Sequence, residues 1–238
     1  MYKVTMLTPD SRLQTPDFSM PGLFITLEGI DGCGKSTQLE MLSHRLEELG
    51  ADFIITRQPG GTRIGERVRD ILLANASAGL APLAELMLYA ADRAQHVSEL
   101  VRPALDAGRI VISDRYTDST TAFQGYGRGL DLELVEELNH LATGGLNPDL
   151  TILFDIDPQE ASARLRARQT AVEAERGMTR FEDEAREFHH RVREGYLKLA
   201  RAHPERIRVI DSSSSARETH EKVMAIVAPM IESIIRKA

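Results

Sequence analysis

The sequence has one cysteine, Cys33, in 238 residues. A single cysteine excludes an internal disulfide framework and suits a reducing compartment, so we expect a cytoplasmic protein. Apolar residues make up 42% of the chain, but none of their runs approaches the ~18 consecutive residues that a membrane span needs. Residues 1–20 lack the apolar centre of a signal peptide, and we interpret them as a flexible leader. We therefore expect no membrane partner.

Positive charge is also scarce. The chain carries 29 Lys and Arg against 36 Asp and Glu, a formal net charge of −7. This balance argues against nucleic-acid binding through a basic face. An acidic enzyme can still bind anionic substrates if its arginines gather in one cleft, so the positions of the arginines matter.

Short apolar runs alternate with helical patterns from Gly22 onward. The runs predict five strands, over Leu23–Leu27, Phe53–Thr56, Ile110–Ser113, Leu150–Ile156 and Ile207–Ile210. The helical patterns include Gly34–Leu49, Pro82–Ala107 with an interruption near Val101–Pro103, and Ala216–Lys237. Strands separated by helices predict βαβ crossovers and a parallel sheet covered on both faces. We see neither a repeat nor a linker, and expect one three-layer α/β domain over residues 21–238.

One stretch matches the spacing of a Walker A phosphate loop in full: Gly29, Ile30, Asp31, Gly32, Cys33, Gly34, Lys35 and Ser36, followed by Thr37. Glycines let backbone N–H groups turn toward phosphate oxygens, and the helix that follows adds its positive end. Lys35 can reach the outer phosphates, and the Ser36 hydroxyl is placed to ligate Mg²⁺. The loop therefore predicts binding of a nucleoside triphosphate with Mg²⁺.

Two side chains of this loop allow more than one interpretation. Cys33 is best explained as a small residue at a variable loop position. Asp31 could align a metal-bound water or a hydroxyl group of a second substrate. It could equally cap the free N–H groups at the start of the helix.

A phosphate loop alone serves switches, motors and phosphotransferases. The sequence has no Asn/Thr-Lys-x-Asp element for reading guanine, and none of its predicted strands ends in Asp-Glu. We interpret Asp155 and Asp157 as a strand terminus before a helix that Pro158 opens. Arginines instead follow the strands: Arg57 and Arg115 lie at predicted carboxyl ends, where ligands bind in parallel sheets. With Arg93, they predict a second anionic group facing the triphosphate, as in a phosphotransferase.

A second group of arginines lies between residues 164 and 180. The weakly apolar segment of about 165–182 predicts a mobile lid that brings positive charge to the transition state and excludes water. We assign the lid role to Arg168 and Arg180. Arg164 and Arg166 fit a solvated helix with internal Glu–Arg pairs instead.

Several motifs together resemble the thymidylate kinase family of the nucleoside monophosphate kinase group, from about Leu23 to the last helix. They are LEGIDGCGKST, TRQPGGT, LYAADRAQH, SDRYTDSTTAFQGYGRG, NPDLTILFDID and RFEDE. The combination of PGGT, DRY and FQG is specific, whereas the phosphate loop alone is not. One departure is Gln58, where the family usually has Glu, which puts an ionic role at that position in doubt.

The resemblance implies a three-layer α/β/α P-loop NTPase fold with an arginine-bearing lid, and ATP-dependent phosphorylation of dTMP to dTDP in a homodimer. It implies that Lys35 bridges the phosphates, that Asp31 organises the substrate and metal side, and that Ser36 and Asp114 hold or approach Mg²⁺. Arg93 and Arg115 would bind the monophosphate, Tyr89 would stack on thymine, and Phe123 would pack against the deoxyribose. The base edge or sugar would be contacted by Ser119, Thr120 and Gln124, and catalytic charge would come from Arg168 or Arg180.

Two other functions stay open from the residues alone. One is a P-loop kinase for a nucleoside or another monophosphate. The other is a nucleotide-binding regulatory module without chemistry, against which the intact Lys35, Ser36, Asp114 and Arg115 argue.

Overall fold

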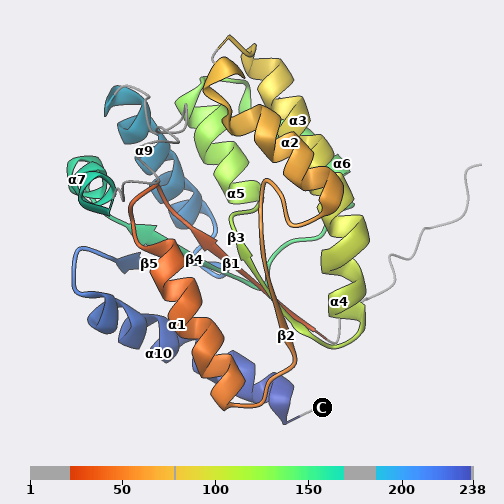
Figure 1. The fold of residues 1–238 in the computed structure, drawn as a ribbon, viewed down its shortest axis with the longest axis vertical. Coiled ribbons are helices and arrows are strands. Elements are labelled where there is room, and N and C mark those ends of the chain that lie inside the picture. Colours follow the sequence, from red (N-terminus) through yellow and green to blue (C-terminus); the bar gives the residue numbers. More distant parts are fainter. Residues whose placement is uncertain (1–21, 78, 169–185, 237–238) are drawn as a thin grey trace, which may run out of the picture.

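A computed structural model of the chain describes residues 22–77, 79–168 and 186–236. Five parallel strands form one sheet in the order β2-β3-β1-β4-β5 (Figure 1). Their bounds are β1 Leu23–Glu28, β2 Phe53–Arg57, β3 Ile110–Asp114, β4 Leu150–Asp155 and β5 Ile207–Asp211. All five predicted strands are confirmed, with ends shifted by one residue.

Helices cover both faces of the sheet because side chains alternate along each strand. On one face, Leu23, Ile25 and Leu27 of β1 share a core with α1 (Lys35–Glu48) and α10 (Ala216–Ile235). The opposite face of β1 carries Phe24 and Glu28. It is covered by η2 (Val97–Val101), α4 (Arg102–Asp106), α5 (Thr117–Thr120) and α9 (Arg186–Ala202). The predicted three-layer arrangement is confirmed.

The remaining helices extend the structure beside the carboxyl end of the sheet. They are α2 (Arg63–Leu73), η1 (Asn75–Ser77), α3 (Pro82–His96), η3 (Thr121–Gly127), α6 (Leu132–Thr143) and α7 (Pro158–Arg168). Helices α2 and α6 both pack against α3. Polar side chains fix their starts, since Thr62 accepts a hydrogen bond from the Gly65 N–H and Asp131 from the Leu134 N–H.

The predicted interruption of the long helix is present but begins one turn earlier. A π-helical turn, Val97–Val101, lies between α3 and α4. Pro103 explains the irregularity because it has no N–H to donate to the carbonyl group of Glu99. The chain therefore widens the preceding turn and keeps its helical direction.

An ion pair between the buried Asp118 and the partly buried Arg206 joins α5 to the start of β5. Both Arg206 Nη atoms bind the Asp118 carboxylate of α5, at 2.6 and 2.9 Å. Thr151 of β4 also donates to Asp118, at 3.1 Å. These contacts fix α5 against the sheet. Within the described part of the chain, every helix is too short or too polar to cross a membrane.

The packing of α9 on η3 depends on a glycine. A Cβ atom at Gly195 would lie 2.6 Å from Cδ2 and 2.8 Å from Cβ of Tyr126. We predict that Gly195→Ala lowers the free energy of unfolding by about 1–3 kcal/mol, because a packed interface must shift. Urea denaturation measures this, with Gly79→Ala, in open space, as the control. Equal effects of the two substitutions would contradict the packing argument.

Candidate active site

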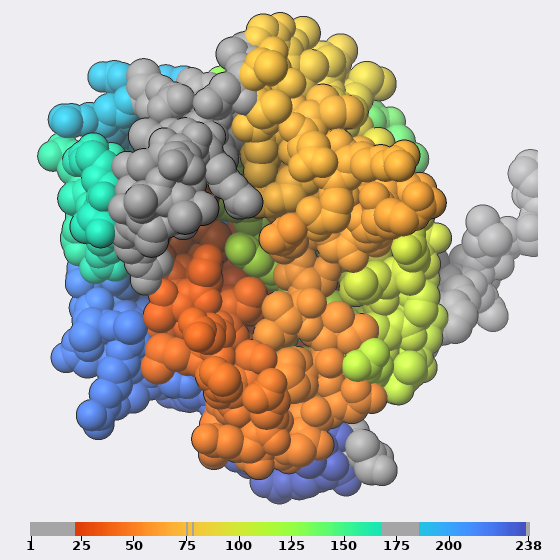
Figure 2. Space-filling model, in the orientation of Figure 1, coloured from red at the N-terminus to blue at the C-terminus, as the bar shows by residue number. Residues whose placement is uncertain are grey.

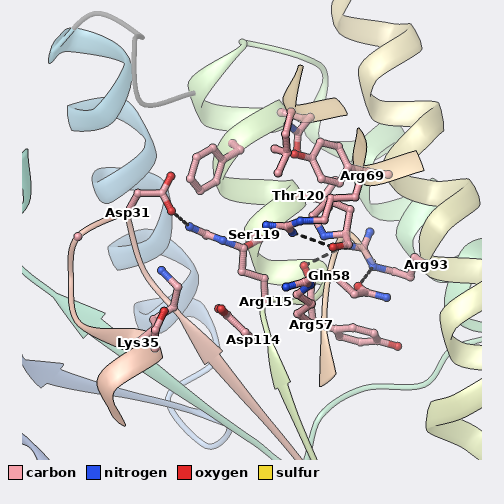
Figure 3. A pocket seen from close by; sticks show the side chains of 18 of the residues that line it. Asp31, Lys35, Arg57, Gln58, Arg69, Arg93, Asp114, Arg115, Ser119 and Thr120 are labelled. Carbon is pink, nitrogen blue, oxygen red and sulfur yellow. Dashed lines mark hydrogen bonds and ion pairs between the residues drawn. The ribbon is translucent and has the colours of Figure 1, made fainter. Parts of the chain in front are cut away.

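A cavity of about 390 Å³ lies at the carboxyl edge of the sheet. Its lining comes from the phosphate loop, the ends of β2 and β3, and helices α2, α3, α5 and α7. Figure 2 shows a hollow here, between the red-orange first strand–helix segment and the golden α2–α3 region. Figure 3 shows cationic and anionic side chains projecting into this space from several elements.

The phosphate loop lies between β1 and α1, as predicted. Gly29 has φ 137°, and a Cβ atom there would lie 2.5 Å from the carbonyl oxygen of Phe154. Only glycine suits that conformation and that close approach. The Lys35 ammonium donates to the carbonyl groups of Gly29 and Ile30, at 2.9 and 3.1 Å, and lies 3.6 Å from Cys33 Sγ. Cys33 is buried, as expected of a side chain that fills the loop.

Asp31 pairs with an arginine and does not cap the helix. Its Oδ1 lies 2.5 Å from Arg115 Nη2 (Figure 3). Helix α1 begins after Gly34, with no side-chain cap at that residue. Burial raises the pKa of Asp31, but the positive charges of Arg115 and Lys35 outweigh it and hold the pKa below its ordinary value. The Asp31 carboxylate is therefore ionised beside the phosphate loop.

Arg115 has an unusual backbone for a residue that is not glycine, with φ 72°. Such a conformation costs ~1–3 kcal/mol and persists where surrounding contacts enforce it. The Arg115 N–H donates to the Leu27 carbonyl group, and the Ser113 hydroxyl donates to the Arg115 carbonyl group. Its Nη1 lies 3.0 Å from the Gly29 carbonyl oxygen, beside the phosphate loop. The turn after β3 thus aims the guanidinium into the cavity.

Arg93 is buried in a different electrostatic setting. It is 1% exposed. It donates to Gln58 Oε1 at 3.0 Å (Figure 3). It also donates to Asn139 Oδ1 and to the Tyr116 carbonyl oxygen, at 2.8 and 3.0 Å. All three acceptors are neutral, so they orient the guanidinium without neutralising its charge. Burial lowers the pKa of Arg93, although nearby acidic groups oppose that effect.

Gln58 acts as a neutral acceptor and is held in one orientation by a histidine. Because its Oε1 faces Arg93, its Nε2 faces His96 Nδ1, at 2.8 Å. That nitrogen must accept, so His96 carries its proton on Nε2 and donates to Thr56 Oγ1, at 2.6 Å. Burial and the charge of Arg93 lower the pKa of His96 to about 4, which keeps the ring neutral.

Two further arginines line the cavity from its outer side. Arg57, predicted from the sequence, forms an ion pair with Glu66 at 2.8 Å. Arg69 of α2 donates to the Pro59 carbonyl group at 2.8 Å and was not predicted. Its position in an amphipathic helix gave no sign of a site, because helical arginines usually face solvent.

The residues expected to contact the acceptor nucleoside also line the cavity. They are Tyr89, Ser119, Thr120, Phe123 and Gln124. Phe123 stacks edge to face with Tyr196 and lies 4.9 Å below the Arg115 guanidinium. The Thr120 hydroxyl is buried without a hydrogen-bond partner in the described residues, so it is available to a bound molecule.

Asp114 and Ser36 both line the cavity, and Asp114 lies between Lys35 and Arg57 (Figure 3). Asp114 Oδ1 is buried and has no hydrogen-bond partner within the described residues. A buried orphan carboxylate oxygen in a cavity that a serine also lines fits a hard cation, since Mg²⁺ takes few protein ligands and completes its shell with water and phosphate. The described residues hold no group of three or more His, Cys, Asp or Glu side chains that would form an all-protein metal cage.

A second pocket, of about 320 Å³, opens on the other side of the phosphate loop. Its lining includes Thr37, Arg164 and Ser212. Arg164 donates to the carbonyl groups of Ser212 and Ser213, and also pairs with Glu160 as expected of a helical Glu–Arg pair. The sequence did not indicate this pocket, because Arg164 looked like ordinary helix surface.

The interpretation of Asp155 and Asp157 as a strand terminus is confirmed. Arg193 of α9 binds Asp155 through two nitrogens, at 2.7 and 2.9 Å. Asp157 accepts from the Gln159 N–H at the start of α7. The prediction of the lid arginines stays a prediction, because Arg180 and the side chain of Arg168 lie outside the described residues. The predicted leader lies outside them as well.

Known proteins share this sequence and fold. A family model for thymidylate kinase matches residues 27–223. The chain belongs to the thymidylate kinase family. A thymidylate kinase of Solidesulfovibrio magneticus is 50% identical over 88% of this chain and 100% of that protein, and one of Geobacter sp. is 51% identical over 83% and 88%. A crystal structure of thymidylate kinase from Ehrlichia chaffeensis matches with a TM-score of 0.70 and 34% identity, covering 87% of this chain and 98% of that one.

Asp92, beneath the PGG loop, gives a prediction about pH. Its Oδ1 accepts from the Gly60 N–H, while Oδ2 is buried without a partner in the described residues. Burial raises its pKa from 3.8 to about 6, so folding favours the protonated acid. The stabilisation is present below pH 3.8 and is lost as the pH rises to about 6, by up to ~3 kcal/mol.

We therefore predict that Asp92→Asn gains stability relative to the unchanged protein between pH 4 and pH 6.5. Urea denaturation across this range measures the difference. Asp106→Asn, at an exposed side chain, provides the control and should leave the free energy of unfolding unchanged across this range. A difference for Asp92→Asn that does not vary with pH would show that this carboxyl group titrates normally.

Proposed function

We infer that this protein transfers the γ-phosphoryl group of ATP to dTMP, giving dTDP and ADP. One observation carries the proposal: a single cavity has the phosphate loop with Lys35 on one side and Arg69 and Arg93 on the other, and Arg115 reaches the loop between them. Two facing anion sites suit transfer between two phosphates, whereas hydrolysis or switching needs only one. The thymidylate kinase family supports dTMP as the acceptor.

On the donor side, the phosphate loop would hold the outer phosphates of ATP. Lys35 would exchange its hydrogen bonds to the carbonyl groups of Gly29 and Ile30 for phosphate oxygens. The pocket beside Arg164 continues from the loop and is open enough for a base, so we assign the adenine to it. Arginine side chains stack well on such planar rings.

Ser36 and Asp114 would hold Mg²⁺, directly or through water. The unpartnered Asp114 oxygen supports this assignment. Bound Mg²⁺ would supply neutralisation of the phosphate charge that develops in the transition state. The ionised Asp31 beside Arg115 would orient the acceptor side of the site.

On the acceptor side, Arg93 and Arg115 would bind the monophosphate, with Arg69 as an additional contact. Arg93 suits this role because its present acceptors leave its charge unneutralised. Tyr89 would stack on the thymine ring, and Thr120 and Gln124 would meet the base edge. Phe123 would lie against the deoxyribose and disfavour a 2′-hydroxyl, since an unpaired buried hydroxyl costs ~1–3 kcal/mol.

Transfer needs no covalent intermediate. The acceptor oxygen attacks the γ-phosphorus in line, and ADP leaves with the electron pair of the broken bond. The residues of the cavity align the two nucleotides and neutralise charge on the equatorial oxygens. Arg168 or Arg180 would add lid charge, as the resemblance implies.

ADP release from ATP and Mg²⁺ should depend strongly on dTMP when dTMP, dUMP, dCMP, AMP, GMP and thymidine are compared. Lys35→Ala should lower kcat by about 1,000-fold or more while the protein stays folded, because it removes the cation between the phosphates. Turnover with a different acceptor would refute the dTMP assignment. Binding of ATP without turnover for any acceptor would favour a regulatory module.

We further propose a cytoplasmic homodimer that uses the outer face of α2, α3 and α6. Exposed apolar side chains gather there: Ile64, Ile71, Leu83, Met87, Leu134 and Leu141. Monomers seldom leave so many large apolar side chains on neighbouring helices in water. An isologous dimer would cover them.

Met87→Lys should therefore shift the protein toward a monomer, because it places a charge in the proposed interface at a side chain that is 57% exposed. Analytical ultracentrifugation gives the mass. Val209→Lys, on the edge strand β5, is the matched control and should leave the mass unchanged. A monomeric unchanged protein would exclude the proposed dimer.

A further inference from the structure

A buried glutamate lies directly behind Arg115 and has no part in the function described so far. Glu28, the last residue of β1, is 0% exposed and lies under the cavity floor. Its Oε1 accepts from the Tyr116 N–H at 2.7 Å. Its Oε2 accepts from the hydroxyl groups of Ser119 and Tyr196, at 2.6 and 2.8 Å. The carboxylate therefore ties β1 to α5 and to α9.

The direction of these hydrogen bonds matters to Arg115. Each hydroxyl group has one proton, and donating it to Glu28 leaves the oxygen lone pairs free to accept. Arg115 Nη1 donates to these same oxygens, at 3.0 Å to Ser119 and 3.1 Å to Tyr196. The two hydroxyl oxygens are 2.7 Å apart, so without Glu28 they could bond to each other instead. Glu28 thus sets which way both hydroxyl groups point.

We propose that Glu28 and Tyr196 are positioning residues for phosphoryl transfer, which hold the Arg115 guanidinium through directed hydroxyl groups. The inference rests on the kinase activity proposed above. Tyr196 contributes a second contact, because its ring meets Phe123 edge to face, at 6.3 Å, and Phe123 lies under Arg115. Through Tyr196, helix α9 therefore supports Arg115 and Phe123, two side chains that line the cavity.

The charges around Glu28 support a role that depends on Arg115. Burial raises the pKa of Glu28 to about 7, and the carboxylate of Asp118 on α5 adds to the increase. Arg115 and the two hydroxyl groups lower it. Arg206 is bound to Asp118, and among the described residues Arg115 is the cation connected to Glu28 through the two hydroxyl groups. A carboxylate in this position is costly for stability alone.

Tyr196→Phe tests the proposal with the smallest change, because it removes only the hydroxyl group. We expect kcat with dTMP to fall about tenfold, as for loss of a hydrogen bond to a charged group, while the KM for ATP changes less than about twofold. Tyr126→Phe is the matched control. The Tyr126 ring, on η3, packs against Gly195, the residue before Tyr196 in α9, and lies 4.9 Å from Lys198 Nζ. Among the described residues it shares no hydrogen bond with Arg115, so this variant should keep normal kinetics.

A double-mutant cycle separates positioning from a general structural effect. In an Arg115→Lys background, Tyr196→Phe and Glu28→Gln should each change kcat by less than about twofold, because the group that they position is gone. Equal losses in both backgrounds, or normal kinetics for Tyr196→Phe, would overturn the proposal. If Glu28→Gln does not fold, the double-mutant cycle of Tyr196→Phe with Arg115→Lys still tests the proposal. Absence of dTMP turnover in the unchanged protein would instead refute the proposed function.

Discussion

The placement of the Arg115 guanidinium is the constraint on which the rest of the site depends. The residue takes a left-handed backbone conformation at the end of β3, and its side chain reaches back to Gly29 of the phosphate loop. Asp31 binds it from the loop side, while Ser119 and Tyr196 hold it from below. Strand ends, loop and two helices must therefore all be in place before this one cation is aligned.

Arg93, which is buried, and Arg115, which is partly buried, differ in a way that suits different tasks. Arg115 is paired with the ionised Asp31, whereas the acceptors of Arg93 among the described residues are all neutral. An unneutralised cation attracts a phosphate group more strongly, and a paired one is oriented more strictly. Neutral His96 and the amide of Gln58 fix Arg93 without cancelling its charge. Alignment before binding reduces the reorganisation that transfer would otherwise need.

Local sequence signals predicted the sheet and the phosphate loop because they depend on neighbouring residues. Alternation, β-branched runs and glycine spacing specified β1 to β5 and the Lys35 loop. The arginines at strand ends were found because parallel strands bring their carboxyl ends to one edge. Glu28, Arg69, Asn139 and Tyr196 were missed, since their roles come from contacts between segments far apart in the chain. For these four residues, one signal was available in the sequence: Glu28 is a charged residue at the end of an apolar strand.

In the phosphotransferase inferred above, two nucleotide sites face each other across one cavity. A molecule in which a polyphosphate chain joins adenosine to thymidine would span both sites, so steady-state inhibition by it tests this arrangement directly. We expect competitive inhibition against ATP and against dTMP alike, because one bound molecule excludes both substrates. Competition with ATP combined with noncompetitive inhibition against dTMP would place the acceptor site elsewhere and refute the shared cavity.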